Sequence, residues 1–209
     1  MNRKNRHIVV IGAGSGGLSA SMILANRGYR VSIYEREDEV GGRNRLLSLG
    51  DYKFDLGPTF LMMDFFLRDI FLLSGRKAED YLQLVKLDPM YKLNYDSGSL
   101  LMTDDHYTMK SGLAQMFPGN EEGLDGFLSR EKVKYDKMYP CLRKDYSSLG
   151  TMFHKDLLKA LPYLDIPKSI FRKLADYFPD EKCRLAFTFQ AKYLGMSPWD
   201  CPAAFAIRR

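Results

Sequence analysis

Residues 7–17 read His-Ile-Val-Val-Ile-Gly-Ala-Gly-Ser-Gly-Gly, a β-branched apolar run that ends in a cluster of glycines. Such a run is typical of a parallel strand covered on both faces, so residues 7–11 are predicted to form a buried strand. Apolar residues then recur at helical spacing before Gly28, which predicts a helix over residues 15–27. Residues 30–35 alternate apolar and polar side chains and predict a second strand. The order strand, helix, strand indicates one βαβ unit.

The glycines of this stretch match the pattern GxGxxG and lie between the predicted strand and the predicted helix, the context that gives the pattern meaning. Gly12 permits the tight turn out of the strand, Gly14 lets a pyrophosphate approach the backbone, and Gly17 lets helix and strand pack closely. The phosphates would bind amides around Ser15 and Gly16, at the positive end of the helix dipole. The pattern alone leaves open a glycine-rich turn that binds no ligand.

Glu35 ends the second predicted strand, 23 residues after Gly12. In a dinucleotide-binding βαβ unit, a carboxylate at this place accepts hydrogen bonds from the hydroxyls of an adenosine ribose. A phosphate on the ribose 2′ oxygen would meet its negative charge, so NADP is disfavoured. The alternative is a surface glutamate within the charged run 35–39. Strand, glycines, helix and acid together predict a dinucleotide site, but they do not separate FAD from NAD.

Five further stretches resemble one family over almost the whole chain. Residues 35–43 (EREDEVGGR) and 54–59 (FDLGPT) resemble the acidic strand end, glycine doublet and next flavin-lining segment of the flavin amine oxidase and carotenoid desaturase superfamily. Residues 87–91 (LDPMY), 117–119 (FPG) and 193–198 (YLGMSP) are similar to stretches of bacterial-type phytoene and diapophytoene desaturases, in the same order. The resemblance therefore favours the amino-terminal portion of a carotenoid desaturase.

The resemblance implies FAD as the cofactor and suggests site residues by matching positions. Gly12, Gly14, Ser15 and Gly17 would hold the FAD pyrophosphate and Glu35 the adenosine ribose, while Gly42, Arg43, Gly57 and Thr59 would line the flavin side. The alternatives are an ordinary turn for Gly41 and Gly42 and a solvated surface charge for Arg43. The implied activity is that of an FAD-dependent oxidoreductase acting on CH–CH bonds of a polyene in carotenoid biosynthesis. No catalytic residue is assigned.

The expected fold class is α/β, with a Rossmann-like βαβ FAD-binding unit in residues 1–60 and a partial, mainly helical substrate or membrane domain in residues 61–209. The parallel sheet is expected to be incomplete, because no later segment repeats the strand, glycine turn and helix. The elements predicted after residue 60 are a helix over 61–73, a hairpin of 91–95 with 99–102, and helices over 120–144, 167–177 and 180–194.

Composition bounds the partners and the compartment. The net charge of +5 suits an anionic surface, but no nucleic-acid-reading motif is present, so no nucleic-acid partner is expected. Three widely spaced cysteines suit a reducing compartment. With no segment apolar enough to span a bilayer and no signal-peptide core, the expected location is cytoplasmic, with peripheral attachment to the membrane as an option.

The expected substrate is a lipophilic polyene, and a membrane surface is a candidate partner. Basic and apolar residues mix between residues 155 and 173, as in a membrane-surface helix pair or an ordinary solvated helix face. Aromatic residues offer either a polyene channel or plain core: Phe65, Phe66, Phe71, Tyr135 and Phe187. The sequence assigns no oligomeric state.

Two alternatives to an active desaturase stay open. Another superfamily member, such as an amine oxidase or a retinol saturase-like protein, shares the glycine and acid motifs. A truncated, catalytically silent product is the other alternative, because nothing in the chain resembles the later strands and the second flavin-binding stretch of the family. The basic finish at residues 206–209, which is unlike the family, suggests an early stop or a frameshift.

Overall fold

The structure, a computed structural model, describes residues 5–206 apart from the side chains of Leu149 and Met152. Residues 1–4, and residues 207–209 of the basic finish, lie outside the described residues. The chain forms two compact units, an amino-terminal unit ending at Lys86 and a carboxyl-terminal unit beginning at Leu87. Each is described by itself.

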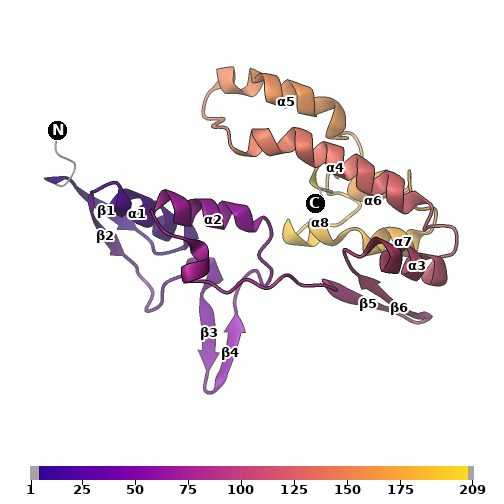
Figure 1. The fold of residues 1–209 in the computed structure, drawn as a ribbon, viewed down its shortest axis with the longest axis horizontal. Coiled ribbons are helices and arrows are strands. Elements are labelled where there is room, and N and C mark those ends of the chain that lie inside the picture. The colour runs from indigo at the N-terminus through magenta and orange to yellow at the C-terminus, as the bar shows by residue number, and fades with distance from the viewer. Residues whose placement is uncertain (1–4, 207–209) are drawn as a thin grey trace. The chain divides into compact units, whose positions relative to one another are not determined.

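The amino-terminal unit opens with the predicted βαβ order: β1 (His7–Ile11), α1 (Ser15–Asn26) and β2 (Arg30–Tyr34). The two strands pair in parallel, with His7 opposite Arg30 and Ile11 opposite Tyr34 (Figure 1). The prediction of a buried strand is wrong, since Val9 is 52% and Ile11 89% exposed. The described residues supply only two strands to this sheet, so much of its apolar surface has nothing to pack against.

A hairpin that the sequence analysis did not predict follows the short 3-10 turn at Gly42–Asn44. Its strands are β3 (Leu46–Leu49) and β4 (Tyr52–Asp55), joined through Gly50, whose φ of +60° places it in the left-handed region. Alternating side chains on both sides of a Gly-Asp turn are a hairpin signal. The resemblance assigns residues 54–59 to a flavin-lining segment, and the structure shows that Phe54 and Asp55 of this segment also belong to β4.

The helix α2 (Asp64–Leu73) packs against α1, and the Asn26 amide donates a hydrogen bond to the Leu73 carbonyl at 3.2 Å. The helix begins at Asp64 rather than at residue 61, because Met63 has a left-handed φ of 58°. Gly75, with φ +73°, follows its end as expected. Since α2 packs with α1, the unit extends to Lys86 instead of ending at residue 60, where the sequence analysis drew the boundary.

The carboxyl-terminal unit begins with the predicted hairpin, β5 (Tyr91–Tyr95) and β6 (Gly98–Met102). The helix α3 (His106–Met116) was not predicted; Asp105 caps it by accepting a hydrogen bond from the Thr108 amide. The long helix α4 (Gly123–Leu142) lies within the predicted range 120–144. These elements enclose an apolar core that includes Leu100, Leu113, Leu124, Phe127, Phe178 and Phe187.

Four short helices follow: α5 (Lys155–Ala160), α6 (Ile170–Leu174), α7 (Glu181–Ala186) and α8 (Phe189–Tyr193), with 3-10 turns at Leu149–Phe153, Leu161–Tyr163 and Ala203–Phe205. The helices predicted over 167–177 and 180–194 are shorter in the structure, and no range was predicted for α5. The helix expected from Pro167 starts at Ile170, because Ser169 caps it instead. Asp180 caps α7 as predicted. The expected helix to residue 194 is broken at Phe187, where the Thr188 hydroxyl donates to the Leu185 carbonyl and α8 starts afresh.

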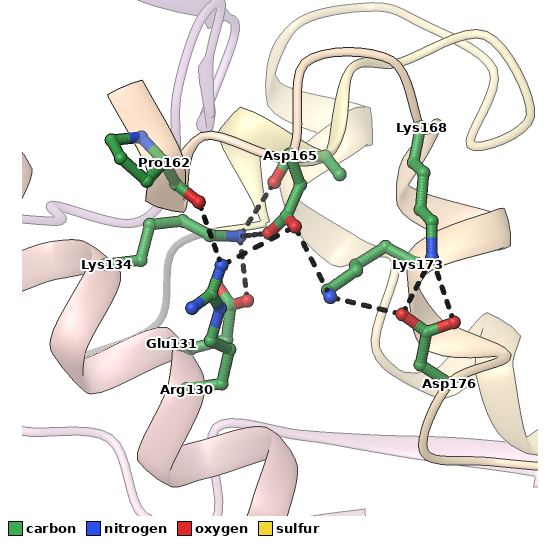
Figure 2. Close-up of polar contacts among 9 residues, drawn as sticks. Arg130, Glu131, Lys134, Pro162, Asp165, Lys168, Lys173 and Asp176 are labelled. Atoms are coloured by element: carbon green, nitrogen blue, oxygen red, sulfur yellow. Dashed lines mark hydrogen bonds and ion pairs between the residues drawn. The ribbon is translucent and has the colours of Figure 1, made fainter. Parts of the chain in front are cut away.

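A buried ion cluster joins α4 to the later segments of the carboxyl-terminal unit (Figure 2). The fully buried Lys134 ammonium donates to Glu131 at 2.8 Å and to the Ala203 carbonyl at 3.0 Å, and it lies 3.6 Å from Asp165. Asp165 also pairs with Lys173 at 3.3 Å. Because these contacts join residues far apart in sequence, the cluster positions the 203–205 turn and α6 against α4.

This cluster changes the interpretation of residues 155–173. The side chains of Ile170 and Phe171 are core, so α6 is not the second half of a membrane-surface helix pair. Lys173 pairs with Asp165 and Asp176, and Lys168 with Asp176. Within residues 155–173, the exposed large apolar side chains are those of Leu158, Leu161 and Ile166, in α5 and in the segment between α5 and α6.

Two further features bear on chemistry. Cys141, Cys183 and Cys201 are free and buried, and burial raises the pKa of the Cys183 thiol to about 12, so it is not a nucleophile at neutral pH. Among residues 5–206 no cluster of histidine, cysteine and acidic side chains is arranged to hold a metal ion. Within the same range, no helix is both long and apolar enough to cross a membrane.

Candidate dinucleotide site

The glycine loop makes the tight turn that links β1 to α1. Gly12 adopts a φ of +95°, and its N–H donates to the Tyr34 carbonyl of β2 at 2.7 Å. A Cβ on Gly17 would lie 2.0 Å from the Gly12 carbonyl oxygen, so a side chain there would force the helix away from the turn. The first and third glycines of the motif therefore have geometric reasons to be glycine.

Gly14 is the N-cap residue of α1, and no side chain caps this end of the helix. The first turn also contains no acidic residue, and Ser15 at its start is exposed. The N–H groups of a first helical turn have no partner within their own helix and form the positive end of its dipole. This end of α1 is thus suited to bind an anion such as a phosphate.

The glycine doublet is held directly against the loop. The Gly41 N–H donates to the Ala13 carbonyl at 2.8 Å, and Gly14 and Gly41 form an isolated parallel bridge. A Cβ on Gly42 would lie 3.1 Å from the Gly14 Cα, and Gly42 has a φ of +59°. The close approach of two backbones, with no side chain between them, leaves a bare surface of peptide groups.

Glu35 organises this surface from the end of β2. Its carboxylate accepts backbone hydrogen bonds from Ala13 at 2.6 Å, Arg36 at 2.8 Å and Glu37 at 3.0 Å. The amides of Glu37 and Ala13 hold the pKa of Glu35 below its usual value, so it is ionised at neutral pH. A carboxylate has about four acceptor positions, so one remains for a ligand hydroxyl.

The remaining predicted site residues lie along the chain beyond the doublet. A Cβ on Gly57 would lie 2.1 Å from the Arg43 carbonyl oxygen, which places these two backbones in close contact. The Arg43 side chain is exposed, and Thr59 is exposed in the irregular segment that leads to α2. The structure therefore brings the loop, Glu35 and Gly42 together, and it brings Arg43 beside Gly57.

Sequence reasoning missed the parts that Ala13 and Arg45 play here. The buried Ala13 connects the loop to both Glu35 and Gly41 through its own backbone. Arg45 pairs with Glu37 at 3.1 Å and its carbonyl accepts from Leu56, so it connects the acidic strand end to the segment before Gly57. Both act through contacts between segments, which no local pattern signals.

Comparison with known proteins relates both units of the chain to known families. The family model for an NAD(P)-binding Rossmann-like domain matches residues 10–67. A 4,4'-diapophytoene desaturase (4,4'-diapolycopene-forming) from Methylomonas sp is 46% identical over 97% of this chain and 40% of its own length. The chain is a relative of the carotenoid desaturases. A zeta-carotene-forming phytoene desaturase from Myxococcus xanthus is 32% identical over 98% of the chain and again 40% of its own length.

This chain thus spans about two fifths of the length of the curated carotenoid desaturases that it matches. Its fold is shared with a solved putrescine oxidase variant, at a TM-score of 0.59 and 19% identity over 96% of the chain and 40% of the oxidase. That likeness shows the fold alone. Together with the βαβ geometry, the comparisons identify a Rossmann-like unit that suits a dinucleotide or flavin cofactor, followed by a mainly helical part.

Proposed function

We propose that the amino-terminal unit is the FAD-binding part of a carotenoid desaturase. The observation that carries the proposal is that the glycine loop contacts two other parts of the chain: the backbone of the doublet at Gly42 and the side-chain carboxylate of Glu35. Each glycine contact leaves no room for a side chain, and the uncapped amino end of α1 opens beside it. The FAD pyrophosphate would bind over Gly14, Ser15 and Gly17.

The other residues of the site have roles that suit the rest of the cofactor. Glu35 would accept a hydrogen bond from a ribose hydroxyl with its remaining acceptor position while it holds the loop in place. Gly42, Arg43, Gly57 and Thr59 would lie toward the flavin, where Arg43 offers a fork of donors to a phosphate. When bound, FAD would supply a hydride acceptor for desaturation, in which a CH–CH unit of a lipophilic polyene loses a hydride from one carbon and a proton from its neighbour to form a C=C bond.

Complementation is the test of this activity. The chain would be expressed with a separate polypeptide that carries the part of the Methylomonas relative that it does not cover, in cells that make 4,4'-diapophytoene. We expect a more conjugated product only when both parts are present, and less product when Gly14 is changed to Val. Product formed without this chain, or a reconstituted complex that binds FAD and makes no product from either 4,4'-diapophytoene or phytoene, would contradict the proposal.

We also propose that α5 and its flanking turns contact a membrane surface. Phe153, Leu158, Leu161 and Ile166 are exposed apolar side chains, and the exposed Lys155 and Lys159 lie among them. Such a mixture binds anionic lipid by apolar insertion and by charge. The chain should sediment with phosphatidylserine vesicles and be released by salt, and Leu158→Asp should abolish sedimentation. Sedimentation that neither salt nor this variant changes would overturn the proposal.

A further inference from the structure

A groove of about 440 Å³ lies within the carboxyl-terminal unit, and none of its lining residues is assigned to the dinucleotide site. Its walls come from β5, the end of α7, α8 and the turn that follows α8. The lining residues are mainly apolar or aromatic: Tyr91, Leu93, Leu185, Ala186, Thr188, Phe189, Lys192, Gly195, Met196 and Pro198. Its volume and lining are those of a small-molecule site.

The groove walls present apolar and aromatic surface, with their polar side chains turned to internal partners. The rings of Tyr91 and Phe189 stack with centroids 4.6 Å apart. The Thr188 hydroxyl donates to the Leu185 carbonyl at 2.8 Å, and the Tyr91 hydroxyl donates to the Ala186 carbonyl at 3.4 Å. A polypeptide in the groove would need partners for its own N–H and C=O groups, whereas a hydrocarbon chain needs none. The lining therefore favours a hydrocarbon.

One charged group accompanies this apolar lining. The Lys192 ammonium lies 5.7 Å from the centroid of the Phe189 ring, so it is positioned on a wall of the groove. Among the lining residues, all of which the structure describes, there is no acidic side chain. An apolar groove with a single cation on its wall is complementary to a hydrocarbon chain that carries an anionic group at one end.

We propose that this groove binds a single-chain amphiphile with an apolar tail and an anionic head group. The tail lies against Tyr91, Phe189 and Met196, and the carboxylate or phosphate head pairs with Lys192. The groove's lining residues all lie in the carboxyl-terminal unit, and none of them is among the residues assigned to the dinucleotide site. It would allow this unit to take up a fatty acid, or an isoprenoid phosphate, directly from a bilayer.

The chain contains its own reporter for the test. Trp199 is the single tryptophan of the sequence and directly follows the groove residue Pro198. Retinoate and retinol have the same apolar chain, differ in head group, and absorb where tryptophan emits. Titration of the purified chain with each probe should quench Trp199 emission saturably. We expect retinoate to bind at least about threefold more tightly than retinol, the difference that an exposed ion pair makes.

Variants separate the head group from the tail. Lys192→Gln should remove the preference for retinoate, and Lys182→Gln, which changes a lysine outside the groove, should leave it unchanged. Phe189→Ala should weaken both probes; if its far-UV spectrum shows lost helix, Met196→Ala replaces it. Equal affinities for the two probes, or a preference that survives Lys192→Gln, would overturn the anionic head group. Absence of saturable quenching, or quenching that neither Phe189→Ala nor Met196→Ala changes, would overturn the proposal that the ligand binds in this groove.

Competition then identifies the source of the ligand. Palmitate and farnesyl phosphate, which absorb little in this range, would each be added to the chain loaded with retinoate. Recovery of Trp199 emission by palmitate alone indicates a fatty acid, and recovery by farnesyl phosphate alone indicates an isoprenoid phosphate. Recovery by neither compound would contradict the proposed class of ligand.

Discussion

At the scale of single residues, Glu35 has a role that the sequence motif does not describe. The motif assigns it to the ribose of the ligand, while the structure shows its carboxylate accepting backbone N–H groups from the loop and from its own strand end. Cofactor recognition and loop order thus depend on one side chain. Its loss affects binding through both routes.

Glu35→Ala is therefore expected to weaken the binding of added FAD by roughly three- to tenfold, the range for one lost hydrogen bond to a ligand. Because the pKa of Glu35 is lowered in the folded chain, its stabilising effect is present above the ordinary glutamate range and is lost as the pH falls through the folded pKa. Titration followed by amide shifts of residues 12–17 measures both effects, with the exposed Glu39→Ala as the control. Identical affinities in wild type and Glu35→Ala would exclude this role.

Two neighbouring glycines provide a matched pair of substitutions. A Cβ on Gly17 would lie 2.0 Å from the Gly12 carbonyl oxygen, whereas a Cβ on Gly16 meets nothing within 4 Å. Gly17→Ala should destabilise the unit by about 1–3 kcal/mol, the usual effect of overpacking. Gly16→Ala should be neutral or stabilise by up to about 1 kcal/mol, since both glycines lie in α1. Urea unfolding measures the difference, and equal effects of the two variants would mean that the close approach is absent.

At the scale of elements, the ion cluster decides how α4, α6 and the 203–205 turn are held together (Figure 2). Lys134 and Glu131 lie one helical turn apart and are both fully buried. Removing one partner of such a pair leaves a buried charge, while replacing both with apolar residues is frequently neutral. We expect Lys134→Met to destabilise the carboxyl-terminal unit by about 3–5 kcal/mol and Glu131→Leu with Lys134→Met to restore most of this. A double variant as unstable as the single one, by urea unfolding, would contradict the explanation.

The same pair predicts a pH dependence. Burial raises the pKa of Glu131, and its bond to Lys134 only partly opposes this shift. A raised folded-state pKa means that the folded chain binds the proton more tightly, so this contribution to stability is complete below the ordinary glutamate pKa and is lost as the pH rises through the folded pKa. Relative to Glu131→Gln, the wild-type chain should become more stable as the pH is lowered from 7 toward 5. A stability difference that stays constant over this range would refute the raised pKa.

At the scale of the whole molecule, the parallel sheet of the amino-terminal unit is too small to cover its own apolar surface. Val9, Ile11, Ile33 and Tyr34 are exposed on its two strands. A parallel sheet is ordinarily covered on both faces, and its open edges expose N–H and C=O groups. The loop that depends on this sheet therefore lacks part of the support that a larger sheet provides.

The 209-residue chain alone is accordingly expected not to retain FAD through gel filtration and not to convert a polyene. Ordering loop residues on binding would subtract about 1–2 kcal/mol for each residue that is fixed. Flavin absorbance in the protein peak, with the purified chain loaded at excess FAD and supplied with phytoene in liposomes, is the measurement. Stoichiometric flavin together with a conjugated product would show that the chain is functional without further strands.

Local patterns predicted the elements whose signals lie within a few residues. The β-branched run and the glycine spacing predicted β1, α1 and β2 to within a residue, and the turn at residues 96–98 predicted the hairpin of β5 and β6. The resemblance to carotenoid desaturases also came from short stretches, and the comparisons confirm it. Backbone dihedral preferences and side-chain periodicity act over a few residues, so the sequence by itself determines these features.

Only the tertiary structure decided the features that depend on distant partners. Glu35 meets Ala13, Gly42 meets Gly14, and Lys134 meets Asp165 and Ala203 across long stretches of chain. Contacts of this kind also make α6 a core helix rather than a membrane-facing one. Its apolar residues Ile170 and Phe171 are buried, and its basic residue Lys173 pairs with Asp165 and Asp176. The local sequence around a charged residue or a glycine does not indicate which distant residue it will contact. The role of such a residue is set by the burial and the neighbours that folding provides.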